Sequence, residues 1–237
     1  MISKNKARSG PPLLGEGVGG GVCTRRALFF SCAFFLFAAP LAAQPAGFTP
    51  VKDEAAFRQN FSKAGQSIQT IQSNFVQEKN LSLLEEKIVS KGQFFFKKEK
   101  KVRLEYTSPY RYLMIIDGDD IIIQDEKKVN KLSAKSNKMF RQINEIIVDC
   151  LAGTALGSPN YTVQAFESKT QYALVLTPKA KTLREFFSTI HVYVDKKNYA
   201  VARVDLNELS GDNTVMRFSN PVLNQPLAQQ VFEVKGE

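Results

Sequence analysis

The stretches that decide the fold are Gly92-Gln93-Phe94-Phe95-Phe96 and Val102-Arg103-Leu104-Glu105-Tyr106. Apolar and charged side chains alternate in the second stretch, which is the period of a β-strand with one apolar and one polar face. We expect two antiparallel strands in which the charges mark the solvent side. The opposite side then carries Val102, Leu104 and Tyr106 and, by the same parity, Phe94 and Phe96.

Outward from this pair, the two-residue period recurs along most of the chain. It predicts further strands at about 70–80, 112–116, 121–124, 161–167, 172–177, 190–195, 200–206, 214–220 and 231–234, with the first pair running over about 86–98 and 102–106. Helical spacing replaces it at 53–65, where Asp53 is a candidate N-cap and Gly65 a candidate stop, and again at 137–151. We expect a mainly β (α+β) fold: an unclosed antiparallel half-barrel of about 11 strands, with helices covering its concave apolar face.

Residues 1–43 differ from the rest of the chain. Arg25-Arg26 precede the apolar run 27–39, and Pro40-Leu41-Ala42-Ala43 follows it, with small residues suited to cleavage after Ala43. This pattern is typical of an export signal peptide, here preceded by an unstructured Gly/Pro-rich segment; a single membrane anchor is the alternative. We therefore predict one domain over 44–237 and a soluble periplasmic location.

Charge argues against a nucleic-acid partner. The 237 residues include 32 basic and 23 acidic ones, and residues 1–43 hold five of the basic residues and one acidic residue. The remaining charge is mildly basic and dispersed, apart from Lys97–Lys101, whose simplest interpretation is a solvated turn.

Few residues could carry chemistry. The chain has one histidine and three cysteines, and two of those cysteines lie within 1–43. We interpret His191 as a structural or surface residue of a strand and Cys150 as a buried, unreactive thiol on an apolar helix face. Asp117, Asp119 and Asp120 fit a hairpin turn better than a calcium loop. Nucleophile–base and nucleotide-binding motifs are absent, so the sequence predicts no enzyme, no cofactor and no metal site.

The chain is instead rich in aromatic residues, with 18 Phe and 7 Tyr. An ordinary β-core would explain them, and so would an apolar cavity beneath a helical lid. For the second case, the candidate cavity residues are Phe75, Phe94, Phe96, Val102, Leu104, Tyr106 and Ile115 on strands and Phe140, Ile143 and Ile147 on the helix at 137–151.

Several motifs together resemble the periplasmic carriers of outer-membrane lipoproteins, the LolA-type family. They are Ile71-Gln72-Ser73-Asn74-Phe75-Val76-Gln77, the block Gly92–Lys98 with Val102–Pro109, Asp117-Gly118, Leu176-Thr177-Pro178-Lys179, and Phe218-Ser219-Asn220-Pro221 with Asn224 and Phe232. The order and spacing of these motifs carry the resemblance, which covers about residues 53–234.

The resemblance implies a monomer that binds the acyl chains of lipoproteins. It would receive them from an inner-membrane ABC transporter and deliver them to an outer-membrane acceptor. Lys98 stands where the family carries an arginine that latches the lid, so we expect it to reach carbonyls of the helix at 137–151. Val102 and Leu104 replace a Phe and a Trp of the family pattern.

Other functions stay open at this point. The same fold could carry another amphiphile, or sense lipoproteins and bind a regulator. The outer-membrane acceptor is itself a lipoprotein, and the sequence around Cys32 is a poor acylation site. A hydrolase lacks any supporting set of residues.

Overall fold

The computed structural model describes residues 44–234 except 99, 126–127 and 134–137, with residues 138–144 described in their backbone only. The described residues belong to one unit, Ala42–Glu237. The predicted signal peptide lies outside them and stays a prediction.

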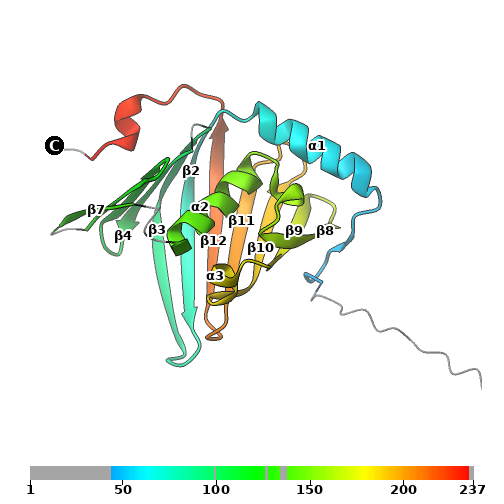
Figure 1. The fold of residues 1–237 in the computed structure, drawn as a ribbon, viewed down its shortest axis with the longest axis horizontal. Coiled ribbons are helices and arrows are strands. Elements are labelled where there is room, and N and C mark those ends of the chain that lie inside the picture. Colours follow the sequence, from blue (N-terminus) through cyan, green and yellow to red (C-terminus); the bar gives the residue numbers. More distant parts are fainter. Residues whose placement is uncertain (1–43, 99, 126–127, 134–137, 235–237) are drawn as a thin grey trace, which may run out of the picture. The chain divides into compact units, whose positions relative to one another are not determined.

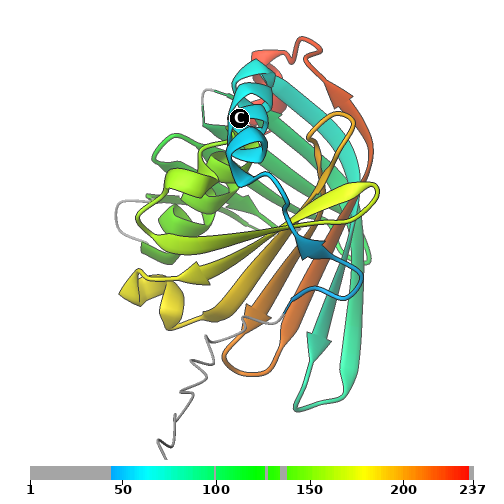
Figure 2. The same ribbon diagram turned by 90° about the vertical axis from the view of Figure 1, so that its right-hand side faces the viewer.

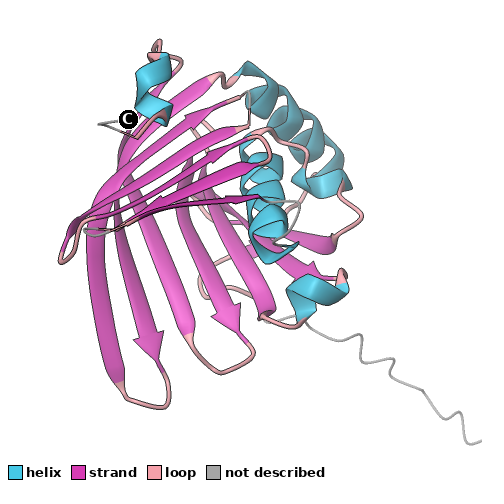
Figure 3. Ribbon diagram, turned by 60° about the vertical axis from the view of Figure 1, so that its left-hand side comes forward, coloured by secondary structure: helices cyan, strands magenta, loops and turns pink. Residues whose placement is uncertain are grey.

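A single curved antiparallel sheet dominates this unit (Figure 1; Figure 3). Its strand order is β1-β8-β9-β10-β11-β12-β2-β3-β4-β5-β6-β7. The first meander comprises β2 (Thr70–Leu81), β3 (Glu86–Lys97), β4 (Lys101–Ser108), β5 (Tyr112–Asp117), β6 (Asp120–Gln124) and β7 (Val129–Ser133). The second comprises β8 (Tyr161–Glu167), β9 (Gln171–Pro178), β10 (Phe187–Asp195), β11 (Val201–Glu208) and β12 (Asn213–Leu223), with the short β1 (Thr49–Pro50) paired to β8.

The two meanders join where β12 pairs with β2. Phe218 lies opposite Phe75 and Met216 opposite Gln77 in this register, and a bulge follows between Ser219 and Val222. The sheet therefore runs unbroken from β1 to β7, and the predicted unclosed, mainly β architecture is confirmed.

The helices lie on the concave side of the sheet (Figure 2). They are α1 (Glu54–Ser67), α2 (Lys138–Leu151) and the single turn α3 (Lys181–Arg184), with the 3₁₀ turn η1 (Ala155–Gly157). A second 3₁₀ turn, η2 (Gln229–Phe232), lies on the opposite, convex face. Asp53 caps α1 as predicted, because its Oδ1 accepts a hydrogen bond of 2.9 Å from the Ala56 backbone N–H. Gly65, in contrast, does not end α1, which continues to Ser67.

Gly65 instead permits backbone contact between the two long helices. A Cβ on Gly65 would lie 2.2 Å from the Ala152 carbonyl carbon, and one on Gly153 would lie 2.4 Å from the Phe61 carbonyl oxygen. Gly153 follows α2 and has a φ of +71°, a left-handed conformation that favours glycine at the C-terminus of a helix. The C-terminal end of α2 is thus packed directly against α1.

The predicted strand at 231–234 is wrong, and so is the expectation that charges mark a purely solvated face. Residues 229–232 form η2, which covers the convex face beside Phe95, Leu113 and Ile115. Arg103 is buried beneath this segment and donates hydrogen bonds of 3.0 and 3.2 Å to the carbonyls of Val231 and Glu233. A buried guanidinium satisfies these carbonyls where a strand neighbour would otherwise do so.

The remaining differences are small. The sheet has 12 strands rather than about 11, because β1 and β7 carry no clear alternation in the sequence. The turn at Asp117–Asp120 is confirmed, and Gly118 adopts a φ of +59° there.

Gly92 shapes the concave face at the centre of the sheet. It lies opposite Phe75 on β2 and Tyr106 on β4, and the rings of these two residues meet edge to face at 5.0 Å. A Cβ on Gly92 would lie 2.7 Å from the Phe75 ring and 2.1 Å from the Glu105 carbonyl oxygen. The Phe75 ring therefore occupies the space that a side chain at residue 92 would need.

We predict that Gly92→Ala destabilises the protein by about 1–3 kcal/mol, because the new methyl group must displace either a backbone carbonyl or a buried ring. Urea unfolding followed by circular dichroism measures the change. Gly157→Ala is the matched control, since its Cβ would meet no atom within 4 Å. Equal stability of the two variants would contradict the packing described.

Candidate functional site: an apolar cavity beneath helix α2

An apolar cavity of about 220 Å³ lies between the concave face of the sheet and α2. Helix α2 crosses this face in front of β10–β12, as two views of the ribbon show (Figure 1; Figure 2). The cavity residues come from both meanders and from α2: Ile71, Ser73, Gln77, Phe94, Leu104, Tyr106, Met114, Ile146, Ile147, Cys150, Leu151, Phe187, Ile190, Val192, Ala200, Val201, Val204, Leu206, Met216, Phe218 and Pro221.

Four of the predicted cavity residues line this space: Phe94, Leu104, Tyr106 and Ile147. Three others, Phe75, Phe96 and Val102, are fully buried in the same cluster of the concave face, without lining the cavity. The side chains of Phe140 and Ile143 lie outside the described residues.

The prediction that Ile115 lines the cavity is wrong. This residue lies on the convex face with Phe95 and Phe232, because its register partner on β4 is Arg103 rather than Leu104. Its neighbour Met114, opposite Leu104, takes the cavity position. Four consecutive apolar residues in β5 hide the parity, so only pairing with the alternating strand β4 reveals it.

About half of the cavity residues come from the second meander, and the sequence pattern indicates none of them as cavity residues. The second meander contributes residues such as Ile190, Val192, Val204 and Phe218. Their strands do show the two-residue period, but nothing local in the sequence indicates that β12 pairs with β2 and brings them opposite Phe94 and Leu104.

Polar atoms are few in the cavity wall. The Tyr106 hydroxyl donates a 2.8 Å hydrogen bond to Gln77 Oε1, and burial raises the pKa of Tyr106 to about 12. The phenol therefore stays neutral at physiological pH and the pair carries no charge. Ser73 is the third polar residue. The wall consequently favours an uncharged, mainly hydrocarbon ligand.

Cys150 lines the cavity from α2 and is 6% exposed. Burial, reinforced by the nearby Asp149 carboxylate, raises the pKa of its thiol to about 12. Since the thiolate is the reactive form, Cys150 is unreactive while α2 covers the cavity.

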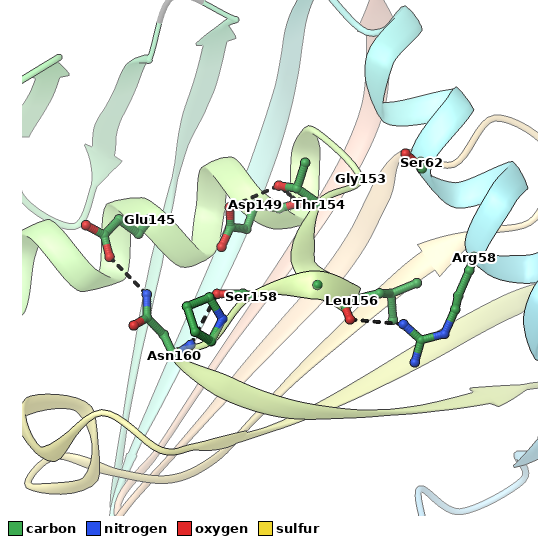
Figure 4. A pocket seen from close by; sticks show the side chains of 11 residues that line it. Arg58, Ser62, Glu145, Asp149, Gly153, Thr154, Leu156, Ser158 and Asn160 are labelled. Atoms are coloured by element: carbon green, nitrogen blue, oxygen red, sulfur yellow. Dashed lines mark hydrogen bonds between the residues drawn. The ribbon is translucent and has the colours of Figure 1, made fainter.

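A second, open hollow lies between α1, α2 and η1, and several polar side chains line it (Figure 4). Arg58 donates a 3.0 Å hydrogen bond to the Leu156 carbonyl, Asn160 donates to Glu145 at 3.3 Å, and Thr154 donates to Asp149 at 3.0 Å. These groups bind one another across the elements that form the hollow. We therefore assign it a structural role, holding the C-terminal end of α2 to α1 and η1.

Lys98 also contacts a helix, but it is α1. Its ammonium donates a 2.6 Å hydrogen bond to the carbonyl of Gln66, in the last turn of α1. We expected this contact at the helix 137–151. Gln66 follows Gly65, which packs on Ala152 just after α2, so Lys98 reaches α2 indirectly.

Within the described part of the chain, no three His, Cys, Asp or Glu residues gather in a way that could hold a metal ion. Nor does that part contain a helix long and apolar enough to cross a bilayer.

The fold and the cavity define a class of proteins in which an open, curved β-sheet and a covering helix enclose an apolar pocket. The chain belongs to the family described as outer membrane lipoprotein carrier protein LolA, whose model matches residues 66–235. This is a family of carriers rather than of enzymes.

Two outer-membrane lipoprotein carrier proteins, from Cupriavidus taiwanensis and Cupriavidus necator, are each 28% identical to the chain over 144 residues. The match covers 60% of this chain and 65% of each relative, so it spans just under two thirds of their length.

Solved structures with similar folds are more distant. A LolA superfamily protein from Nitrosomonas europaea is 11% identical, with 75% of this chain and 97% of that one covered, at a TM-score of 0.40. The lipoprotein LppX of Mycobacterium tuberculosis is 12% identical, with coverages of 74% and 99%, at a TM-score of 0.42. In the MucA/MucB complex of Pseudomonas aeruginosa, the matched chain is 13% identical, with coverages of 77% and 61%, at a TM-score of 0.43.

The position of Cys150 allows closure of the cavity to be measured. In the full chain carrying Cys23→Ser and Cys32→Ser, we predict that iodoacetamide labels Cys150 at pH 8 far more slowly than it labels the urea-unfolded protein. The buried thiol holds little thiolate at that pH, whereas an unfolded thiol with a pKa near 8.5 holds a substantial fraction. Labelling as fast as in urea would show that α2 does not shield the cavity.

Proposed function

We propose that the protein is a periplasmic chaperone that binds the acyl chains of lipoproteins in the cavity beneath α2 and carries them from the inner to the outer membrane. The cavity between the concave face and α2 is the observation that carries this proposal, since it gives the family relationship a physical site. An inner-membrane ABC transporter would supply the cargo and an outer-membrane acceptor would receive it.

The energetics require such a cavity. Each acyl methylene contributes about 0.8 kcal/mol to membrane binding. Three chains of about 14 methylenes each therefore hold a lipoprotein in the bilayer by roughly 30 kcal/mol. A carrier must offer the chains a surface of comparable apolarity. Side chains such as Leu104, Ile190 and Phe218 provide one without imposing a specific chain length.

The size of the cavity indicates that the described conformation is closed. About 220 Å³ falls below the range of about 300–1,000 Å³ that is usual for pockets holding small ligands. Three acyl chains do not fit within it. Uptake then requires α2 to move away from the sheet, and the Gly65–Gly153 contact favours movement of the other end of the helix.

Carriage of a different amphiphile, or sensing of lipoproteins, would use the same cavity. Mass spectrometry of material that co-purifies with the protein from the native periplasm distinguishes lipoprotein carriage from carriage of another amphiphile, because it identifies the bound molecule. Transfer to a purified acceptor separates the second, because a sensor binds lipoproteins without passing them on.

Leu104→Glu tests whether the cavity is the binding site. The carboxylate would face the apolar wall. Burying an unpaired charge there against acyl chains costs at least about 2–3 kcal/mol of binding free energy. We predict loss of co-purified lipoprotein in a protein that still gives a folded circular-dichroism spectrum. Thr107→Glu is the control, since Thr107 is exposed on the same strand. Equal cargo in both variants would exclude this face as the site.

Lys98 is the proposed latch of the closed state, acting through α1. Removing its hydrogen bond to Gln66 should loosen the end of α1 that packs on Ala152 and Gly153. We predict that Lys98→Ala accelerates iodoacetamide labelling of Cys150 and eases release to the acceptor, whereas Lys98→Arg keeps labelling slow and delays hand-over.

The control for this prediction is Lys91→Ala, which removes an exposed lysine from the same strand pair. If Lys98→Ala, Lys98→Arg and Lys91→Ala label at the same rate, Lys98 is a solvated surface charge and the closed state has no lysine latch.

A further inference from the structure

Ser73 presents an unpaired hydroxyl in the wall of the apolar cavity. It lies on β2 and is 3% exposed, and Ile71 and Phe94 line the cavity beside it. Across the part of the chain that the structure describes, its Oγ is the one buried side-chain oxygen or nitrogen without a hydrogen-bond partner.

The position of this hydroxyl follows from strand parity. Ile71, Ser73, Phe75 and Gln77 are alternate residues of β2, so they share the concave face. Ile71 and Phe75 are almost fully buried apolar residues. A serine between them forfeits apolar contact and leaves a buried polar atom unsatisfied, which alanine would avoid.

The other polar atoms of the wall do not share this property. The Tyr106 hydroxyl donates its hydrogen to Gln77 Oε1 at 2.8 Å, so neither of these two oxygens is without a partner. Gln77 lies four residues beyond Ser73 on the same strand face, at a distance of about 13 Å along an extended chain. Among the buried side-chain oxygens and nitrogens of the described cavity wall, Ser73 Oγ is therefore the one that an entering molecule would find without a hydrogen-bond partner.

From this we infer that Ser73 Oγ donates a hydrogen bond to the carbonyl oxygen of the ester or amide group of an acylated ligand, and so fixes how far the chain enters the cavity. The inference rests on the proposed function, which supplies a ligand of this chemistry. A carbonyl next to an acyl chain has acceptor oxygen lone pairs, and an ester carries no donor of its own, so it complements a lone hydroxyl. A plain hydrocarbon would leave the hydroxyl unpaired.

The test compares two probes with the full chain and with Ser73→Ala: methyl laurate carrying a ¹³C carbonyl, and tridecane, each delivered from cyclodextrin. We expect Ser73→Ala to weaken methyl laurate roughly 3- to 10-fold, the effect of one neutral hydrogen bond, and to leave tridecane binding unchanged or tighter. The infrared carbonyl stretch of bound methyl laurate should lie at lower frequency in the wild type than in Ser73→Ala.

Two controls keep the result specific. Ser219→Ala makes the same chemical change at an exposed position of neighbouring β12 and should alter neither probe. The empty Ser73→Ala protein should melt at a higher temperature than the wild type, because it loses an unsatisfied buried hydroxyl.

The outcomes are distinct. Equal affinities and equal carbonyl frequencies in wild type and Ser73→Ala would overturn the inference and leave water as the partner of Ser73, while the proposed function stands. A wild type that takes up neither probe would overturn the proposed function and this inference with it.

Discussion

The alternation of side chains across one continuous, curved sheet is the constraint on which the site depends. Twelve strands spaced at about 4.8 Å make a face roughly 50 Å wide, whereas a 14-residue helix such as α2 is about 21 Å long. One helix cannot fill the hollow of such a sheet. Apolar residues of both meanders therefore meet beneath α2 with space left between them, and that space is the cavity.

The two faces of the sheet arise from the same alternation of side chains but differ in how they are packed. On the concave face, Leu104 and Phe94 leave room for a ligand. On the convex face, alternate residues such as Phe95 are covered by the chain's own C-terminal segment. There Arg103 forms an ion pair with Glu105 at 2.7 Å and donates hydrogen bonds to two carbonyls of that segment. Consecutive residues of β4 therefore belong to different environments: one side chain lines the cavity and the next packs into the core on the other face.

Much of this could be predicted from the sequence, and the failures have physical causes. Strand parity placed Phe94, Leu104 and Tyr106 correctly, because charged neighbours mark the opposite face. It failed at Ile115, because β5 has four consecutive apolar residues and the local pattern cannot assign a face there. The strand expected at 231–234 failed where two of its backbone carbonyls, those of Val231 and Glu233, accept hydrogen bonds from the buried Arg103, which is far away in sequence. The contributions of β10–β12 and the contact of Lys98 with α1 depend on long-range pairing, which local periodicity does not encode.

The seam between β12 and β2 has a consequence for how the chain folds. Each meander forms from neighbouring hairpins, but β2 gains its second partner only when the last strand of the domain has been made. Until then β2 is a free edge bordered by apolar residues such as Ile71 and Phe75, the kind of surface that recruits other strands. The interval between the appearance of β2 and the arrival of β12 is therefore the stage at which this chain is most exposed to aggregation, and the stage at which a folding helper would protect it.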